Sequence, residues 1–299
     1  MGQQISVECG ESGPHTYEDT WGGQLPPIPD AVLEEVFYFI PGQDVVCVCR
    51  LVCQQWKEIV DSTSYWKGRC RREGLKPYNH NKPAKGWCQF YILSKRRQNL
   101  LKNPKADGGF SGWQIISNEG DKWKIEPGPF PDERVQKYFV TSYSSCIKSQ
   151  LIDLSEEGYG PYLMDEIQPD IVISDWYSPR WDCGSQYEIC VELLNRKQKI
   201  INRFRPNRVV FPQWNEMQWQ QMTHVFRDYG PGVRFIRFTH GGQDTQFWAG
   251  WYGIRVTNSS VEIAPPGEME PPGPDPSKCC DCPPKREGMQ NSEFHKNFK

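Results

Sequence analysis

Residues 240–260 gather the side chains best suited to recognise a ligand. Four aromatic residues lie within six consecutive positions, and they are Phe247, Trp248, Trp251 and Tyr252. Aromatic rings give an amphipathic ligand contact area, and neighbouring polar groups such as Asp244 fix its orientation. Four glycines around the rings free the backbone for turns and close approach. We therefore predict a recognition loop at the rim of a β domain. The alternative is that Trp248 and Trp251 are buried packing residues.

The four aromatic residues are expected to have two different roles. Phe247 and Trp248 lie on the predicted turn, so both are candidates for stacking on a ligand. Trp251 and Tyr252 come just before a predicted strand at residues 254–261. We expect these two side chains to pack against the protein and hold the turn in place.

Composition and charge limit what the chain can be. Its 299 residues can hold one large or two modest domains, and its 26 glycines and 25 prolines are typical of a turn-rich, largely β protein. A formal net charge of −2 creates no field that would favour nucleic acid. The sequence has no run of about 20 apolar residues and no secretory signal. We therefore expect a cytoplasmic protein whose cysteines are mostly thiols.

The elements that would position the recognition loop form an α + β multidomain chain. Short apolar runs separated by Gly-Pro turns predict an antiparallel β-sandwich, of the jelly-roll, galactose-binding-like kind, over residues 109–265. Strands are predicted at residues 113–116, 135–141, 146–154, 171–176, 187–194, 222–226, 233–238 and 254–261. Residues 75–108 are predicted to be a helical linker whose apolar helix includes Trp87 and Phe90.

Three short helices are predicted over residues 25–74. Asp30 is the predicted cap of the first helix, which ends at Pro41. Asp44 is the predicted cap of a second helix that continues to residue 60, and a third short segment passes through Trp66. Three short helices cannot bury this much apolar surface by themselves. They therefore need a partner surface or, alternatively, pack on the rest of the chain.

Both ends of the chain, residues 1–24 and 266–299, lack a core and are predicted to be disordered. The first six residues, MGQQIS, match the N-myristoylation pattern at Gly2, and Cys9 is a candidate for a second acylation. One acyl chain would give only marginal, peripheral membrane binding. In the tail, Cys279, Cys280 and Cys282 fit no regular zinc spacing. Neither a metal nor a cofactor is predicted.

Several spaced elements follow one another between residues 25 and 74. They are LPPIPD at residues 25–30, Pro41, CRLVC at residues 49–53, Trp56 and Trp66. This order resembles an F-box. An F-box implies docking onto the Skp adaptor of an SCF-type ubiquitin ligase, whose cullin–RING core supplies the transfer chemistry, so the chain is expected to be non-catalytic. By this resemblance the adaptor contact would be carried by Leu25, Pro26, Ile28, Leu33 and Val36.

Five segments of the β region also have a recognisable order. They are KYFVTSY from Lys137, KSQLIDL from Lys148, PDIVISDW from Pro169, DCG from Asp182 and RVTNSS from Arg255. Residues 109–264 thereby resemble the carbohydrate-recognising domain of the sugar-binding F-box proteins, and within that family the F-box only six and forty-four subgroup. The family binds the core of high-mannose N-linked glycans at one end of its sandwich.

The resemblance implies which residues would bind the glycan. Tyr143, Asp182 and the Phe247–Trp248 pair would surround the inner two N-acetylglucosamines. A C–H face of the sugar would pack on Trp248, and the Asp182 carboxylate would accept hydrogen bonds from the sugar. At Ala249 the tightest-binding relatives look to carry a lysine, so we expect binding weaker by about 1–3 kcal/mol.

The implied partners are N-glycosylated proteins that have unfolded, because a folded carrier shields the inner glycan core. The chain would then mark glycoproteins for endoplasmic-reticulum-associated degradation, in the cytoplasm or at the cytosolic face of that membrane. One alternative is a ligase receptor that has lost glycan binding and recognises a protein surface. Another is a glycoside hydrolase, which would need two carboxylates about 5–9 Å apart. Asp182 and Asp244 are its candidates, although nothing in their spacing marks them as a pair.

Overall fold

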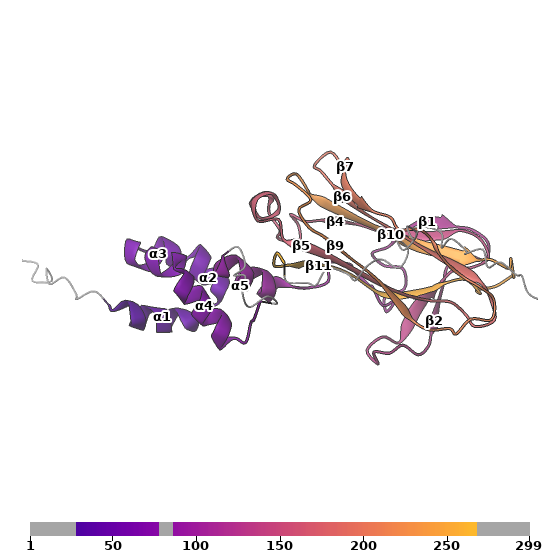
Figure 1. The fold of residues 1–299 in the computed structure, drawn as a ribbon, viewed down its shortest axis with the longest axis horizontal. Helices are drawn as coiled ribbons and strands as arrows, with labels where there is room; N and C mark the ends of the chain where they lie inside the picture. Colours follow the sequence, from indigo (N-terminus) through magenta and orange to yellow (C-terminus); the bar gives the residue numbers. More distant parts are fainter. Residues whose placement is uncertain (1–27, 78–85, 268–299) are drawn as a thin grey trace, which may run out of the picture. The chain divides into compact units, whose positions relative to one another are not determined.

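The computed structural model describes residues 28–77 and 86–267 of the chain (Figure 1). The contacts divide the chain into two units, one ending at Ser62 and the other beginning at Thr63. Within the described ranges, no helix has the length and apolar character needed to cross a membrane. Leu25 and Pro26, the predicted acylation sites and the tail cysteines lie outside the described residues.

The first unit consists of α1 (Asp30–Tyr38), α2 (Gly42–Cys47), the 3₁₀ turn η1 (Cys49–Leu51) and α3 (Gln54–Asp61). The prediction of one continuous helix from Asp44 to residue 60 is wrong. The chain leaves the α-helix after α2 and is extended at Cys53 before α3 begins. The break includes Val48 and Val52, whose β-branched side chains favour helices less than straight side chains do.

The predicted helix caps also differ from the structure. Pro29 and Pro41, rather than Asp30 and Asp44, hold the N-cap positions of α1 and α2. Proline fixes its own backbone angle and needs no hydrogen-bond partner for its nitrogen, so it suits the start of a helix. The Asp30 carboxylate instead accepts a hydrogen bond from the Gln55 side chain (2.8 Å), which links α3 to α1.

The second unit begins with α4 (Thr63–Arg72) and α5 (Trp87–Arg96). The position of α5 confirms the short apolar helix predicted in the linker. After α5 the chain runs beside β11 (Arg255–Ala264), where the Asn99 side chain bonds to the strand backbone. Leu100 and Leu101 are then buried in the sandwich core. Residues before position 109 thus contribute to the core of this unit.

The strands of the second unit form a two-layer antiparallel sandwich, which confirms the predicted fold class (Figure 1). One sheet has the order β1-β4-β10-β6-β7, with β8 paired to β6, and the other has the order β2-β3-β11-β5-β9. The first sheet contains β1 (Gln114–Asn118), β4 (Cys146–Asp153), β6 (Ser185–Leu194), β7 (Ile200–Phe204), β8 (Val209–Phe211) and β10 (Phe235–Asp244). The second contains β2 (Lys124–Pro127), β3 (Lys137–Val140), β5 (Asp170–Ser178), β9 (Gln220–Phe226) and β11.

All eight predicted strands are present, whereas β2, β7 and β8 were not predicted. These three are short strands outside the centres of the sheets, and only one of their residues is buried. The central strands show the alternation of buried and exposed side chains most clearly. In β6 the side chains of Tyr187, Ile189, Val191 and Leu193 are buried at every second position, as predicted.

A polar network crosses the core between the two sheets. The Lys148 Nζ atom lies 2.6 Å from His240 Nε2, and His240 Nδ1 lies 2.6 Å from a carboxylate oxygen of Asp175. The Tyr187 hydroxyl donates to the same Asp175 oxygen, and the Ser259 hydroxyl donates to the other. All five side chains are buried. Buried polar groups are tolerated when they are paired in this way.

Residues 240–244 belong to β10 and not to the predicted recognition loop, which is shorter and spans residues 245–254. Gly241 and Gly242 pair with β4 on one side and β6 on the other. A Cβ atom at Gly241 would collide with the Cys146 carbonyl, and one at Gly242 would collide with the Gln186 carbonyl. These two glycines therefore allow close packing of strands rather than a turn.

Candidate functional site

Asp244 ends β10 and supports the loop at residues 245–254. One of its carboxylate oxygens accepts hydrogen bonds from the backbone amides of Gln246 (3.0 Å) and Phe247 (2.7 Å). Its own amide donates to the Ser142 carbonyl at 2.9 Å. Asp244 is fully buried, and this burial raises the pKa of its carboxyl. Because the carboxylate is buried and engaged with backbone amides, Asp244 organises the loop and is not placed to act on a glycosidic bond.

Phe247, Trp248 and Ala249 are exposed on this loop. The exposed fraction is 73% for Phe247 and 38% for Trp248, so the alternative of a buried Trp248 is wrong. Phe247 has a φ angle of +55°. This left-handed conformation costs a residue with a side chain about 1–3 kcal/mol and persists where the surroundings hold it. Here the Asp244 carboxylate holds the Phe247 amide, so the loop presents its rings in a fixed conformation.

Trp251 and Tyr252 are half-buried and hold the loop, as expected. The Trp251 indole nitrogen donates to the Asp121 carbonyl (3.2 Å), and the Asp121 carboxylate accepts from the Gly250 amide (2.5 Å). Lys124 lies over the Trp251 ring, with its Nζ atom 4.2 Å from the ring centroid. Tyr252 meets Trp248 edge to face, at 5.5 Å between ring centroids.

Hydrogen bonds join this loop to its neighbours at the same end of the sandwich. The β3–β4 loop carries Tyr143, and its Ser142 carbonyl accepts from the Asp244 amide. The β5–β6 loop carries Asp182, and it is joined to the recognition loop by the bond from the Thr245 amide to the Gly184 carbonyl (2.9 Å). Tyr143 and Asp182 are half-buried. The structure thus brings together the three loops that carry the five predicted glycan-binding residues.

Sequence reasoning missed four residues at this end of the sandwich. Asp121 accepts hydrogen bonds from the Gly250 amide and the Trp251 indole nitrogen of the loop, and Arg180 donates to the Trp251 carbonyl at 2.7 Å. No local signal marks either residue, because both act through contacts distant in sequence. Trp181 and Trp214 are exposed and lie close together, at 5.1 Å between ring centroids. A tryptophan among polar turn residues, as at Trp214, was the available signal.

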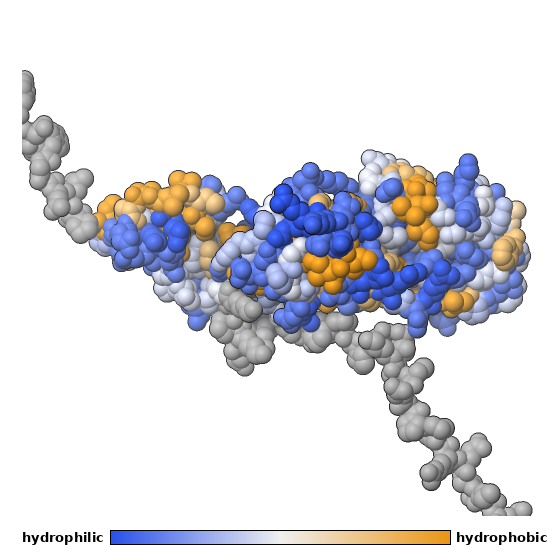
Figure 2. All heavy atoms as spheres, turned by 90° about the horizontal axis from the view of Figure 1, so that it is seen from above, coloured by the Kyte–Doolittle hydropathy of each residue, from blue (hydrophilic) through white to orange (hydrophobic). Residues whose placement is uncertain are grey.

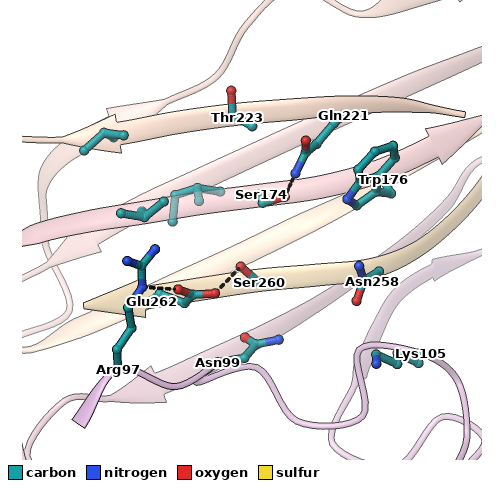
Figure 3. A pocket seen from close by; sticks show the side chains of 13 residues that line it. Arg97, Asn99, Lys105, Ser174, Trp176, Gln221, Thr223, Asn258, Ser260 and Glu262 are labelled. Carbon is teal, nitrogen blue, oxygen red and sulfur yellow. Dashed lines mark hydrogen bonds and ion pairs between the residues drawn. The ribbon is translucent and has the colours of Figure 1, made fainter. Parts of the chain in front are cut away.

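A groove on the outer face of the second sheet is a separate surface feature (Figure 3). Its volume is about 510 Å³. Several of its polar side chains bond to one another, including Gln221 to Ser174 (2.7 Å) and Arg97 to Glu262 (2.7 Å). None of the predicted glycan-binding residues lines the groove. The groove is therefore distinct from the loop end of the sandwich, where the five predicted residues lie.

A second candidate surface lies on the first unit, where several hydrophobic side chains are exposed to solvent (Figure 2). The exposed residues are Ile28, Val32, Val36, Phe39, Val48, Leu51 and Val52. Of the predicted adaptor contacts, Ile28 and Val36 are half exposed and belong to this surface. Leu33 does not, because it is only 2% exposed. The prediction for Leu33 is corrected accordingly: its side chain packs inside the protein.

The described residues thus form two contact surfaces, one apolar and helical, the other built of aromatic loops at one end of a β-sandwich. Comparison with known families matches residues 25–68 to the F-box domain and residues 91–263 to the F-box associated region. The chain belongs to the family of F-box proteins that carry an F-box associated region.

Curated relatives agree with this assignment over most of their length. F-box only protein 6 of Mus musculus is 47% identical over 251 residues, which cover 82% of this chain and 85% of the relative. F-box only protein 44 of Homo sapiens is 44% identical over 250 residues, which cover 82% and 98%. Among solved structures, TmCBM61 in complex with β-1,4-galactotriose covers 56% of this chain and 99% of its own, with 16% identity and a TM-score of 0.35.

Proposed function

We propose that the chain is the substrate-recognition subunit of an SCF-type ubiquitin ligase and binds the chitobiose core of high-mannose N-glycans on misfolded glycoproteins. The first unit would dock onto the Skp adaptor, and the sandwich would hold the glycan. Ubiquitin transfer to the carrier protein would direct it to endoplasmic-reticulum-associated degradation. The cullin–RING core would carry out the transfer, so this chain acts as a non-catalytic receptor.

The exposed Phe247–Trp248 pair beside the Asp182 loop carries the glycan half of the proposal. A pyranose ring has a C–H face that packs on an indole, and its hydroxyls donate hydrogen bonds to a carboxylate such as Asp182. Tyr143 brings a third aromatic ring from the neighbouring loop. The inner sugars of a folded glycoprotein are shielded, so such a site would select unfolded carriers.

The exposed apolar face of the first unit supports the adaptor half. Phe39 is 87% exposed and Leu51 is 74% exposed. Large apolar side chains gathered on a surface mark a site of protein association. An F-box implies that this partner is the Skp adaptor and, through it, the cullin. Ile28 and Val36 remain proposed contacts, and Leu25 and Pro26 rest on the sequence resemblance alone.

A second candidate function is favoured by Ala249. This exposed residue offers a methyl group where a charged donor would strengthen a bond to a sugar. Without that donor, the same exposed rings could contact an apolar protein surface. The chain would then be a ligase receptor that has lost glycan binding and recognises its substrates through protein contacts.

Calorimetric titration of chitobiose into the full-length protein tests the choice. The proposal predicts saturable binding that Trp248→Ala abolishes. Tyr162→Ala is the matched control, because Tyr162 is 71% exposed and precedes the turn Leu163–Ile167. That turn reaches the other end of β10 through the ion pair between Asp165 and Arg234. If the wild type and Trp248→Ala both give only background heat, glycan binding is refuted and the protein-surface alternative stands.

N-terminal acylation is a further part of the proposal. An acyl chain at Gly2, with a second at Cys9, would add peripheral contact with the cytosolic face of the endoplasmic reticulum or another membrane. Both residues lie outside the described part of the chain, so sequence pattern alone supports this part. Gly2→Ala should shift the protein from the membrane fraction to the soluble fraction. Unchanged fractionation would contradict it.

A further inference from the structure

Trp181 and Trp214 form an exposed aromatic pair outside the predicted glycan-binding residues. Their exposed fractions are 56% and 65%. The ring centroids lie 5.1 Å apart and the ring planes are inclined by 48°. Exposing two adjacent indoles to water has a cost in free energy that a purely structural pair would avoid by burial. The pair therefore has the character of a ligand contact.

Asn215 fixes this pair in position. Its side-chain nitrogen donates to the carbonyls of Arg180 (2.6 Å) and Pro212 (3.1 Å), and its backbone amide donates to the Trp181 carbonyl (3.0 Å). Its side-chain oxygen accepts from the Met217 amide (2.8 Å). These bonds join the β5–β6 loop, which carries Trp181, to the loop between β8 and β9, which carries Trp214. The two rings are thus held by a shared support.

Strain at Trp214 supports a ligand-binding role. Trp214 has a φ angle of +59°. A left-handed conformation costs a non-glycine residue about 1–3 kcal/mol and is found where function or packing requires it. Packing does not require it here, because the Trp214 side chain is mostly exposed. The strained backbone instead presents the ring to solvent beside Trp181.

The pair adjoins the proposed glycan site. Trp181 directly precedes Asp182 in the β5–β6 loop. The same loop is bonded to the recognition loop through Arg180, which donates to the Trp251 carbonyl, and through the Thr245 amide, which donates to the Gly184 carbonyl. A ligand that occupies the site at Asp182 and continues past it on the Trp181 side therefore meets the tryptophan pair next.

We infer that Trp181 and Trp214 bind a pyranose ring of the same glycan beyond the inner two N-acetylglucosamines. This inference rests on the proposed glycan-binding function. Two fixed indole faces suit the flat C–H face of a sugar. Asp182 follows Trp181 in the chain and Glu216 lies two residues after Trp214, and carboxylates such as these accept hydrogen bonds from sugar hydroxyls. Proteins that bind varied apolar peptide segments usually do so with flexible surfaces rich in methionine. The rigid support at Asn215 favours the sugar.

Glycans of two lengths test the inference with the full-length protein. Chitobiose has only the inner two sugars, and the pentasaccharide of chitobiose with three mannoses extends beyond them. The wild type should bind the pentasaccharide about tenfold more tightly than chitobiose, which corresponds to about 1.4 kcal/mol. Trp214→Ala and Trp181→Ala should remove this gain and leave chitobiose affinity within about twofold. Trp214→Phe should keep most of the gain, and Tyr162→Ala should change neither affinity.

Separate outcomes overturn the two proposals. If the wild type binds neither ligand, the proposed glycan-binding function is refuted and the inference falls with it. If the wild type binds chitobiose but Trp214→Ala keeps the full gain for the pentasaccharide, or no gain exists, the inference alone is refuted. If Trp214→Ala weakens binding only to an unfolded, deglycosylated carrier, the pair contacts peptide and the inference is again refuted. Unchanged denaturation curves exclude misfolding as the cause.

Discussion

Replacing Lys148 with methionine should remove a pH dependence from the stability of the sandwich. The Lys148 side chain is fully buried, with its Nζ atom 3.1 Å from the centroid of the Trp113 ring and 2.6 Å from His240 Nε2. Burial lowers the pKa of Lys148 well below its usual value of 10.5, while the Asp175 carboxylate acts in the opposite direction. Methionine keeps the apolar stem and removes the amine.

The sign of the effect follows from proton binding. Between the lowered folded-state pKa of Lys148 and 10.5, the unfolded chain binds more protons than the folded protein. The free energy of unfolding therefore rises with pH in this window, by up to about 1.4 kcal/mol per pH unit for one group. Above the folded-state pKa and below pH 10.5, the wild type should therefore gain stability relative to Lys148→Met at up to this rate for each pH unit.

Urea unfolding of both proteins at a series of pH values measures this difference. Cysteines and tyrosines also titrate at alkaline pH, but they are common to both proteins and cancel in the comparison. Lys137→Met is the matched control, because Lys137 is exposed on β3 and its replacement should leave the pH profile unchanged. A constant difference between the wild type and Lys148→Met would show that the buried amine keeps its charge, and it would refute the reasoning.

Three further predictions concern the loop, the first unit and the core. Asp244→Ala removes the acceptor of two loop amides, so the free energy of unfolding should fall by about 1–3 kcal/mol. Chitobiose binding should also be lost in calorimetry. If stability and binding were both fully retained, the loop would have other support. Leu51→Asp should abolish pull-down of the Skp adaptor without lowering the free energy of unfolding, whereas Leu33→Ala should lower it by about 2–5 kcal/mol in urea unfolding. If Leu51→Asp lowered stability and only Leu33→Ala abolished the pull-down, Leu33 would be the contact residue and Leu51 the packing residue. Burial lowers the pKa of His240 from 6.5 to about 4. Between pH 6.5 and about pH 4 the unfolded chain therefore binds more protons than the folded protein. The free energy of unfolding should fall by about 3 kcal/mol as the pH drops through this range. His240→Gln should flatten that acid-side loss in the same assay, and an unchanged slope would assign it to other groups.

The elements that depend on local pattern could be predicted from the sequence. Central strands such as β6 alternate between buried and exposed positions, and this alternation is visible in the residue types. The exposure of Phe247 and Trp248 also followed from a local pattern, because rings among glycines and polar residues indicate a turn. The strands β2 and β7 lie at sheet edges and bury no residue completely, so their sequences carry little of this signal.

Features that depend on contacts distant in sequence could not be predicted. His240 and Asp244 read as part of a polar loop, but their partners Asp175 and Ser142 place them in a strand. The break between α2 and α3 was missed because the apolar positions continue through it. The support of the Trp181–Trp214 pair joins two loops about thirty residues apart, and only the fold brings them together.

The nuclear magnetic resonance signal of the Trp248 indole N–H tests the central claim most directly. The signal can be assigned by its loss in Trp248→Phe and followed as chitobiose is added to the full-length protein. Binding at the loop end predicts a saturable shift of the Trp248 signal and no shift of Trp66, which is buried in α4. A saturable shift of Trp176 in the sheet groove with Trp248 unmoved, or no shift at all, would contradict the proposed site.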